Sequence, residues 1–407
     1  MNLTLNDLIL TYCGSPLKMR NKTYSSALTV CNCSYVDITN LVITKSRGIG
    51  LTILNHQEGI VHIALSNFTD NIAPKEEDGV SKILGGGGVY VGEFQQNSQL
   101  PISFEFENCI FDKNVACTRQ YNSFYTDEFG RNRSGCGRGG GVFVALDNEM
   151  KHQCVNITFS YCSFTNNHAF LGGGLSVTIG RGRKIIETNI TVTVEDSVFE
   201  SNGCSDVTRI GGGAHLSYNS ESLSKFGNEY NIRNVNFTNN CAELGGGVYF
   251  FSHKQKSSDN SLLFDNCIFE RNKAHTGSAI DMTPNIFTRL STGHTIVVPV
   301  FRNCQFVYNK VLVNSQSPDT QEIAGIGTLY ASLYDIKFEG ENHFEYNEGT
   351  AVYVVNGIAD FSHSSAFFNS NQGRRGGAIA LIGASSCLLY TSPSPRDATL
   401  SRMPSSA

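Results

Sequence analysis

The chain has 407 residues and a formal net charge of −5, and only 16% of its residues are charged. So mild an acidic balance gives no reason to expect nucleic acid or an anionic membrane surface as a partner. Forty residues are Gly, none is Trp, and no apolar run is long enough to span a membrane. This composition suits a β-rich repeat body better than a helical one.

A short phrase recurs along the chain: Phe, two residues and Asn, followed after a gap by a glycine run and a β-forming residue. One copy runs over residues 111–114 and continues at Gly139. Residues 7–11 and 40–44 fit the same frame without Phe. The motif phenylalanines are Phe68, Phe111, Phe164, Phe199, Phe237, Phe269, Phe306, Phe344 and Phe368. Together these segments give about eleven repeats, which is typical of a stacked architecture.

Each repeat contains short runs of Val, Ile, Phe and Tyr that are interrupted by Asn and Gly, and such runs predict β-strands. No stretch shows a sustained helical period. A short coil of strands that advances by one strand spacing per repeat is a parallel β-helix. We therefore predict an all-β fold over residues 1–384, a single-stranded right-handed parallel β-helix of about eleven coils and on the order of 50 Å long.

The recurring residues have mechanical reasons. The motif Phe is expected to point inward and to stack on the Phe of the next coil. Asn recurs three residues before and three residues after this Phe, where it can adopt left-handed turn geometry and form a hydrogen-bonded ladder. The glycines are expected at a corner with positive φ or close backbone approach. A phosphate cradle is disfavoured, because no Gly-Lys-Ser/Thr or helix signal follows the glycine run.

Both ends look foreign or incomplete. Residues 387–397 and 401–407 resemble one reading frame of a transposon-type sequencing adapter, so we set residues 385–407 apart as a non-native tail without fixed structure. The alternative is an authentic Ser/Pro-rich linker. Residues 1–10 lack the features of a signal peptide and already fit the repeat. We expect a fragment cut at both ends, with a membrane anchor elsewhere in the full-length protein left open.

The thirteen cysteines fall into two groups. Cys109, Cys162, Cys267 and Cys304 stand two residues before a motif Phe and are expected to be buried thiols. Cys117, Cys136, Cys154, Cys204 and Cys241 lie in loops or just after the motif Asn and are disulfide candidates. Cys204 with Cys241 is the first predicted bridge, because both follow the motif Asn on adjacent coils; Cys117 with Cys136 is the second. Cys31-x-Cys33 is the only tight pair, so we expect no metal and no cofactor.

Eight Asn-x-Ser/Thr sequons occur, and with the cysteines they suggest a secreted or cell-surface protein. Asn67 and Asn236 are expected to lie inside the ladder, where a glycan does not fit. The remaining sequons are the candidate glycosylation sites: Asn2, Asn21, Asn32, Asn132, Asn156 and Asn189.

The Phe-x-x-Asn phrase with Gly-Gly-Ala-Ile at residues 376–379 resembles the repeats of chlamydial polymorphic outer-membrane proteins. The chain as a whole is similar to right-handed β-helix proteins of sponges and other simple animals. Both groups belong to the pectate-lyase-like superfamily. The resemblance covers about residues 1–384 and rests on repeat residues, so it implies the fold. The bacterial group implies adhesion, and the animal group implies no particular activity.

Three functions remain open. An enzyme acting on polysaccharides would need paired carboxylates, or Arg with Asp-bound calcium as in pectin-degrading relatives, and neither pattern is evident; Gly293-His294 is an isolated partial match. A purely structural surface rod is the second possibility. The third, which we favour, is non-catalytic adhesion or binding of glycans or surface proteins through residues 117–136. The candidate contact residues of this loop are Tyr121, Phe124, Tyr125, Phe129, Arg131 and Arg133, unless its aromatic side chains pack against the coil itself.

Overall fold

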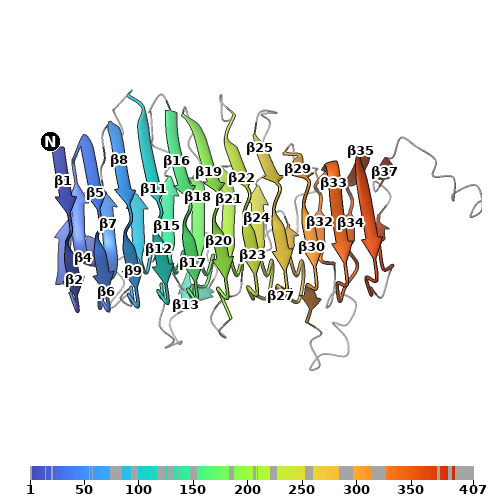
Figure 1. Ribbon diagram of the computed structural model, residues 1–407, viewed down its shortest axis with the longest axis horizontal. Helices are drawn as coiled ribbons and strands as arrows, with labels where there is room; N and C mark the ends of the chain where they lie inside the picture. Colours follow the sequence, from blue (N-terminus) through green and yellow to red (C-terminus); the bar gives the residue numbers. More distant parts are fainter. Residues whose placement is uncertain are drawn as a thin grey trace, which may run out of the picture.

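The computed structural model is an all-strand parallel solenoid that winds through eleven coils (Figure 1). No helix occurs among the residues it describes. Those residues are 2–13, 15–19, 22–54, 56, 58–73, 85–92, 100–116, 124–126, 132–134, 137–146, 154–182, 188–204, 208, 210–220, 227–252, 260–283, 297–312, 327–373, 376–383 and 387–389. In Figure 1 the coils follow one another from the blue N-terminal end to the red C-terminal end.

Each coil contributes a strand to each of three faces. The first-face strands are β1 (Asn2–Asn6), β5 (Tyr35–Thr39), β8 (Gly59–Ala64), β11 (Ile102–Glu107), β16 (Cys154–Ser160), β19 (Asn189–Glu195), β22 (Glu229–Arg233), β25 (Ser261–Asp265), β29 (Pro299–Arg302), and the first parts of β33 (Ile336–Glu345) and β35 (Ile358–Asn369). Their alternating burial, as in β11, places every second side chain in the core.

The second face is made of three-residue stretches that carry the motif Phe at their centre, with Leu10 and Ile43 in its place on the first two coils. They are β2 (Ile9–Thr11), β6 (Val42–Thr44), β9 (Asn67–Thr69), β12 (Ile110–Asp112), β17 (Ser163–Thr165), β20 (Val198–Glu200), β23 (Asn236–Thr238), β26 (Ile268–Glu270), β30 (Gln305–Val307), and the second parts of β33 and β35. The pairing along this face is parallel and in register, with Phe111 opposite Phe68 and Phe164.

The third-face strands follow the glycine corner. They are β4 (Lys22–Cys31), β7 (Ile49–Leu54), β10 (Val89–Gly92), β15 (Val142–Leu146), β18 (Leu175–Gly182), β21 (Ala214–Ser220), β24 (Val248–Ser252), β28 (Ile280–Met282), β32 (Leu329–Ser332), β34 (Val352–Val355) and β36 (Ile379–Ile382). β3 (Ser15–Met19) pairs antiparallel with β4. β13 (Phe124–Thr126) and β14 (Asn132–Ser134) form an antiparallel hairpin, and β27 (Lys273–Ala274) pairs with β31 (Lys310–Val311).

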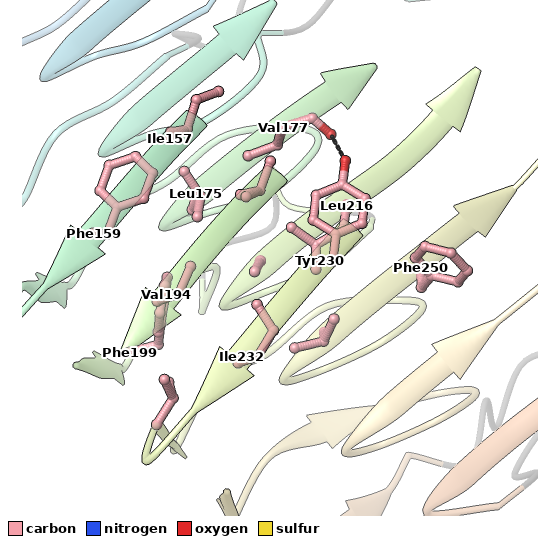
Figure 2. Packing of buried hydrophobic residues seen from close by; sticks show 14 of the residues in the cluster. Ile157, Phe159, Leu175, Val177, Val194, Phe199, Leu216, Tyr230, Ile232 and Phe250 are labelled. Carbon is pink, nitrogen blue, oxygen red and sulfur yellow. Dashed lines mark hydrogen bonds between the residues drawn. The ribbon is translucent and has the colours of Figure 1, made fainter. Parts of the chain in front are cut away.

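The core contains the predicted aromatic column. Neighbouring motif phenylalanines from Phe68 to Phe368 stack with ring centroids 4.4 to 5.4 Å apart. Figure 2 shows side chains of the first and third faces, Tyr230 among them, packed in the core with Phe199 of this column. The Tyr230 hydroxyl donates to the carbonyl oxygens of Ser217 and Val177, so this buried polar atom is satisfied. The prediction of an inward Phe stack is confirmed.

The two recurring Asn rows have different tasks. The Asn three residues before the motif Phe, such as Asn234, adopts left-handed geometry (φ 53°) at the turn between the first and second faces. The Asn three residues after the Phe is buried and forms a continuous amide ladder. Asn240, for example, donates from both its backbone N and its Nδ2 to Asn272 Oδ1 at 3.0 Å, and from Nδ2 to the carbonyl of Phe199 at 2.9 Å. Both expected roles of Asn are confirmed, one in each row.

The glycine corner leaves no room for side chains. Gly139 has a φ of 60°, and a Cβ on Gly140 would lie 2.3 Å from the carbonyl oxygen of Gly173. The amides of this corner are also occupied, because Gly140 N donates to the carbonyl of Gly172 at 3.1 Å. The glycine run is therefore a packing device, and its N–H groups are not available to cradle a phosphate.

The predicted bridge between Cys204 and Cys241 is present, with Cα atoms 4.7 Å apart. Cys117 and Cys136 lie outside the described residues. The expectation that Cys154 joins a disulfide is wrong: this cysteine is free and opens β16, where it pairs with Asn189 of the next coil. The thiols before the motif Phe are free and buried as predicted, namely Cys109, Cys162, Cys267 and Cys304.

The tail differs from its expectation at three residues. Cys387–Leu389 form β37, which pairs in parallel with Ile358–Asp360 of β35. β35 is the last complete first-face strand, and its backbone groups offer an unpaired edge that any short β-forming run can join. Residues 390–407 lie outside the described part of the chain.

Candidate functional site

The predicted contact loop is described only in part. Phe124 and Tyr125 belong to β13 and Arg133 belongs to β14, and the register places Tyr125 opposite Arg133. Tyr121, Phe129 and Arg131 lie outside the described residues. The hairpin brings one aromatic and one cationic position together in sequence register, and the role of the loop stays a prediction.

The sequons show which outer surfaces are open to modification. Asn2, Asn32, Asn156 and Asn189 are exposed, and the side chains of Asn21 and Asn132 are outside the described set. The expectation for Asn67 and Asn236 is wrong, because they precede the inward Phe by one position and therefore point outward from the second face. Asn236 is exposed and Asn67 is half-buried. No sequon follows Asn236 in the sequence.

A column of polar and aromatic side chains lies on the outer side of the third face. Its members are paired coil by coil, and all but the half-buried Tyr330 are buried. This outer column consists of Thr52, Tyr90, Phe143, Ser176, His215, Tyr249, Asp281, Tyr330 and Tyr353. Its titratable members make it the first place to look for chemistry.

His215 is held neutral in this column. Its Nδ1 lies 3.1 Å from Ser176 Oγ, and its ring stacks on Tyr249 with centroids 5.9 Å apart. Burial lowers the pKa of His215 to about 3, with a smaller contribution from the charge of Arg138. A hydroxyl beside an imidazole is the arrangement of a nucleophile and its base. An imidazole with so low a pKa is a poor base at neutral pH, so the pair favours a structural role.

Asp281 is the buried carboxyl of the same column, two coils beyond His215. Its Oδ1 accepts a hydrogen bond from Thr283 Oγ1 at 2.5 Å, and its Oδ2 has no hydrogen-bond partner. Burial raises the pKa of Asp281 to about 7, against the opposing hydrogen bond from Thr283. Such a carboxyl could donate a proton at neutral pH. Glycoside hydrolysis needs a second carboxyl group facing the same bond, and the column supplies none among its described residues.

Three exposed aromatic side chains, Tyr308, Tyr346 and Phe367, lie on the later coils of the solenoid, while others, such as Tyr12 and Tyr161, lie on earlier coils. Tyr308 and Tyr346 occupy left-handed turns after β30 and β33, where they are 48% and 45% exposed. Their rings stack with centroids 5.1 Å apart and an interplanar angle of 11°. Arg271 lies on the coil that precedes Tyr308, and its guanidinium is 5.5 Å from the Tyr308 ring centroid. Ser370 follows in the same turn position, and we name Arg271, Tyr308, Tyr346 and Ser370 the tyrosine row.

The second face beside this row adds another exposed stack. Phe367 is exposed and stacks on His343 with centroids 4.7 Å apart. His343 Nδ1 lies 3.5 Å from Glu345 Oε1, one strand position before Tyr346. Because alternate side chains of a strand lie roughly 7 Å apart on one face, the His343 stack and the tyrosine row border a single surface.

Repeat alignment could have identified both groups. Each member of the outer column is the second residue after its glycine corner, as in Gly213-Ala214-His215 and Ala279-Ile280-Asp281. Each member of the tyrosine row stands two residues after the motif Phe, as in Phe306-Val307-Tyr308. Both groups stand at variable positions between the repeated Phe, Asn and Gly residues, and the sequence-based predictions did not include them.

Among the described residues, no group of three or more His, Cys, Asp or Glu side chains is placed to hold a metal ion. In the same part of the chain, no helix is long and apolar enough to cross a membrane. Comparison with known proteins finds no matching family model, no similar curated protein and no similar solved structure.

Proposed function

We propose that this chain is a non-catalytic module of an extracellular or cell-surface protein, which acts in adhesion or binding. The observation that carries the proposal is the tyrosine row, two exposed stacked aromatic rings fixed on a rigid repeat body. Exposed Tyr and Arg on a scaffold that loses little entropy on binding are typical of recognition surfaces. The Phe-x-x-Asn and Gly-Gly-Ala-Ile repeats support adhesion through their resemblance to the chlamydial outer-membrane proteins and the wider pectate-lyase-like superfamily.

An extracellular location agrees with the Cys204–Cys241 bridge, because disulfides persist in oxidising compartments. The exposed sequons at Asn2, Asn32, Asn156, Asn189 and Asn236 agree with it as well. Expression through a eukaryotic secretory pathway, followed by peptide mapping with and without glycosidase, tests the location. Recovery of the bridge and of glycosylated Asn156 or Asn189 is the expected result.

The second candidate is a polysaccharide-acting enzyme, and the observation that favours it is the buried Asp281 carboxyl, with its raised pKa and its unpartnered Oδ2. The test is incubation of the full chain with neutral and uronate-rich polysaccharides, with assay for new reducing ends and unsaturated products. Binding without turnover is expected. Turnover that is lost in Asp281→Asn would replace the binding proposal with the enzymatic one.

A further inference from the structure

We infer that the tyrosine row and the adjoining second-face residues form a binding site for a neutral glycan, with the uncovered face of Tyr346 as the stacking platform. This inference rests on the proposed binding function and names its ligand class. It is carried by ring geometry, by the pairing of nearby charges, and by the distribution of sequons along the solenoid.

The two rings of the row are covered unequally. Tyr308 has Arg271 over one face and Tyr346 over the other. Tyr346 stacks on Tyr308 with one face, and its other face is directed toward the next coil. The residue of the row on that coil is Ser370, whose side chain is too short to cover a phenol ring. Coils advance by about 4.8 Å, so the replacement of an aromatic residue by Ser leaves a step on which a flat sugar ring can stack.

Hydrogen-bonding groups border this step. Ser370 and Asn369 are exposed, and Ser370 Oγ donates to Asn369 Oδ1 at 3.0 Å. Glu345 lies at the second-face position next to Tyr346. An aromatic face beside an amide, a hydroxyl and a carboxylate offers donors and acceptors to sugar hydroxyls, with an apolar surface beneath them. Sites of this composition orient a ligand through a few polar groups and gain affinity from the buried apolar area.

The charges near the row select against anionic polymers. Arg271 pairs with Glu270, and Lys310 Nζ lies 2.7 Å from Glu348 Oε2. The His343 ring is beside Glu345. Among the described residues of this surface, Arg271 and Lys310 thus each have their own carboxylate, which disfavours attraction of a sulfate or uronate chain.

The sequons leave this part of the solenoid bare. All eight lie at or before Asn236, whereas the tyrosine row begins at Arg271. Glycans added to the chain itself would cover coils nearer the N-terminal end. The surface around Tyr346 would stay accessible to a ligand on another molecule.

The test uses the full chain and substitutions that preserve the left-handed turn conformation. Asn occupies the left-handed position of this row at Asn166 and Asn239, so Tyr346→Asn and Tyr308→Asn keep a residue that tolerates positive φ. The matched control is Tyr161→Asn: Tyr161 is 60% exposed and also has positive φ, but lies in the other turn row. Biolayer interferometry would measure binding to immobilised chitohexaose, mannohexaose, cellohexaose, polygalacturonate and heparan sulfate.

We expect binding to at least one neutral hexasaccharide, at least tenfold weaker in Tyr346→Asn and unchanged in Tyr161→Asn. Tyr308→Asn should weaken binding less, because Tyr308 only supports the platform. Binding that Tyr346→Asn does not alter, or binding confined to the two anionic polymers, would overturn the neutral-glycan site and leave the general binding function standing. Absence of binding to every probe also overturns the inference. In that case, adhesion of protein-coated beads to animal cells separately decides the proposed function.

Discussion

The Asn ladder and the outer column of the third face are built by the same stacking of coils, yet their chemistry differs. In the ladder one residue type repeats, and the amide of each Asn both donates to one neighbour and accepts from another. In the outer column Ser176, His215, Tyr249 and Asp281 follow one another, and Asp281 Oδ2 is left without a partner. A repeated position can stabilise the whole rod, whereas a varied position creates local properties that depend on individual pairs.

The largest expected effect is the loss of one rung of the ladder. Asn240→Leu removes the acceptor of Asn202 and the donor to Phe199 and Asn272. Buried polar groups on both neighbouring coils therefore lose a hydrogen-bond partner. Each buried polar group left without its hydrogen bond costs roughly 1 kcal/mol or more, so the free energy of unfolding should fall by about 4–6 kcal/mol. Urea denaturation followed by circular dichroism measures it.

The outer-column counterpart is Ser176→Ala, which removes only the contact with His215 and should cost about 1 kcal/mol. If both substitutions lower the free energy of unfolding by the same amount, the distinction between a ladder that stabilises the whole rod and a local side-chain pair is wrong.

Two titrations in the outer column should oppose each other. Asp281 has a folded pKa raised to about 7 from 3.8, so its contribution to stability falls as pH rises from about 4 to 7. His215 has a folded pKa lowered to about 3 from 6.5, so its contribution falls as pH drops below about 6.5. Between about pH 4 and 6.5 the folded and unfolded states bind the same number of protons at this pair. The two slopes of the free energy of unfolding against pH therefore cancel.

Single substitutions should unmask each slope. His215→Gln leaves Asp281 alone, and stability relative to the parent protein should fall by about 3 kcal/mol between pH 4 and 6.5. In Asp281→Asn, where His215 remains, the free energy of unfolding relative to the parent protein should change with pH by a similar amount in the opposite direction, and stability should be lost toward pH 4. The described groups near the pair are Arg138 and Ser176 at His215, Tyr330, Tyr334 and Thr283 at Asp281, and Tyr249 between them. Thermal unfolding of the three proteins across this range provides the measurement, and parallel pH curves would refute the compensation.

The disulfide should have an effect of similar size, and it separates the loop cysteines from the ladder cysteines. Replacing Cys204 and Cys241 together with Ala should cost about 3 kcal/mol, because the bridge closes a long loop of the unfolded chain. Cys162→Ser should cost under about 1 kcal/mol. Ser66 and Ser197 already occupy the equivalent turn position, where each donates to a backbone carbonyl at 2.7 Å as the Cys162 thiol does at 3.4 Å. Denaturation of oxidised protein should rank the two changes in this order, and a costlier Cys162→Ser would contradict the assignment.

The smallest effect on stability is expected in the tyrosine row. Tyr308→Asn removes an exposed ring stack and an exposed cation–π contact, for a loss of about 0.5 kcal/mol. A loss above about 2 kcal/mol would mean that the row stabilises the rod as the ladder does, which would weaken its assignment as a binding surface.

The repeated features could be predicted from sequence because each acts in nearly every coil. Phe164 and Asn167 recur at fixed spacing, and only an inward stack and an amide ladder explain that recurrence. The Cys204–Cys241 bridge followed from the same frame, since both residues sit after a ladder Asn. The prediction for Cys154 was wrong, because a cysteine at the start of a strand cannot be told from a loop residue until the strand bounds are known.

The outward direction of Asn236 and the burial of Asp281 depend on the third dimension. The alternation of side chains across a three-residue strand turns Asn236 to solvent while Phe237 enters the core. The burial of His215 and Asp281, with the resulting shifts of their pKa values, arises from packing on the outer side of the third face. No local sequence signal reports whether that side is covered.

The sequence by itself determined the coil, its repeat count, the aromatic column and the Asn ladder, because these depend on a period that every repeat restates. Only the tertiary structure decided which variable residues become neighbours. Arg271, Tyr308 and Tyr346 are separated by 37 and 38 positions in the sequence and come together because strand pairing aligns their coils. Stacking converts a distance along the chain into one strand spacing, and so creates both the outer column and the tyrosine row.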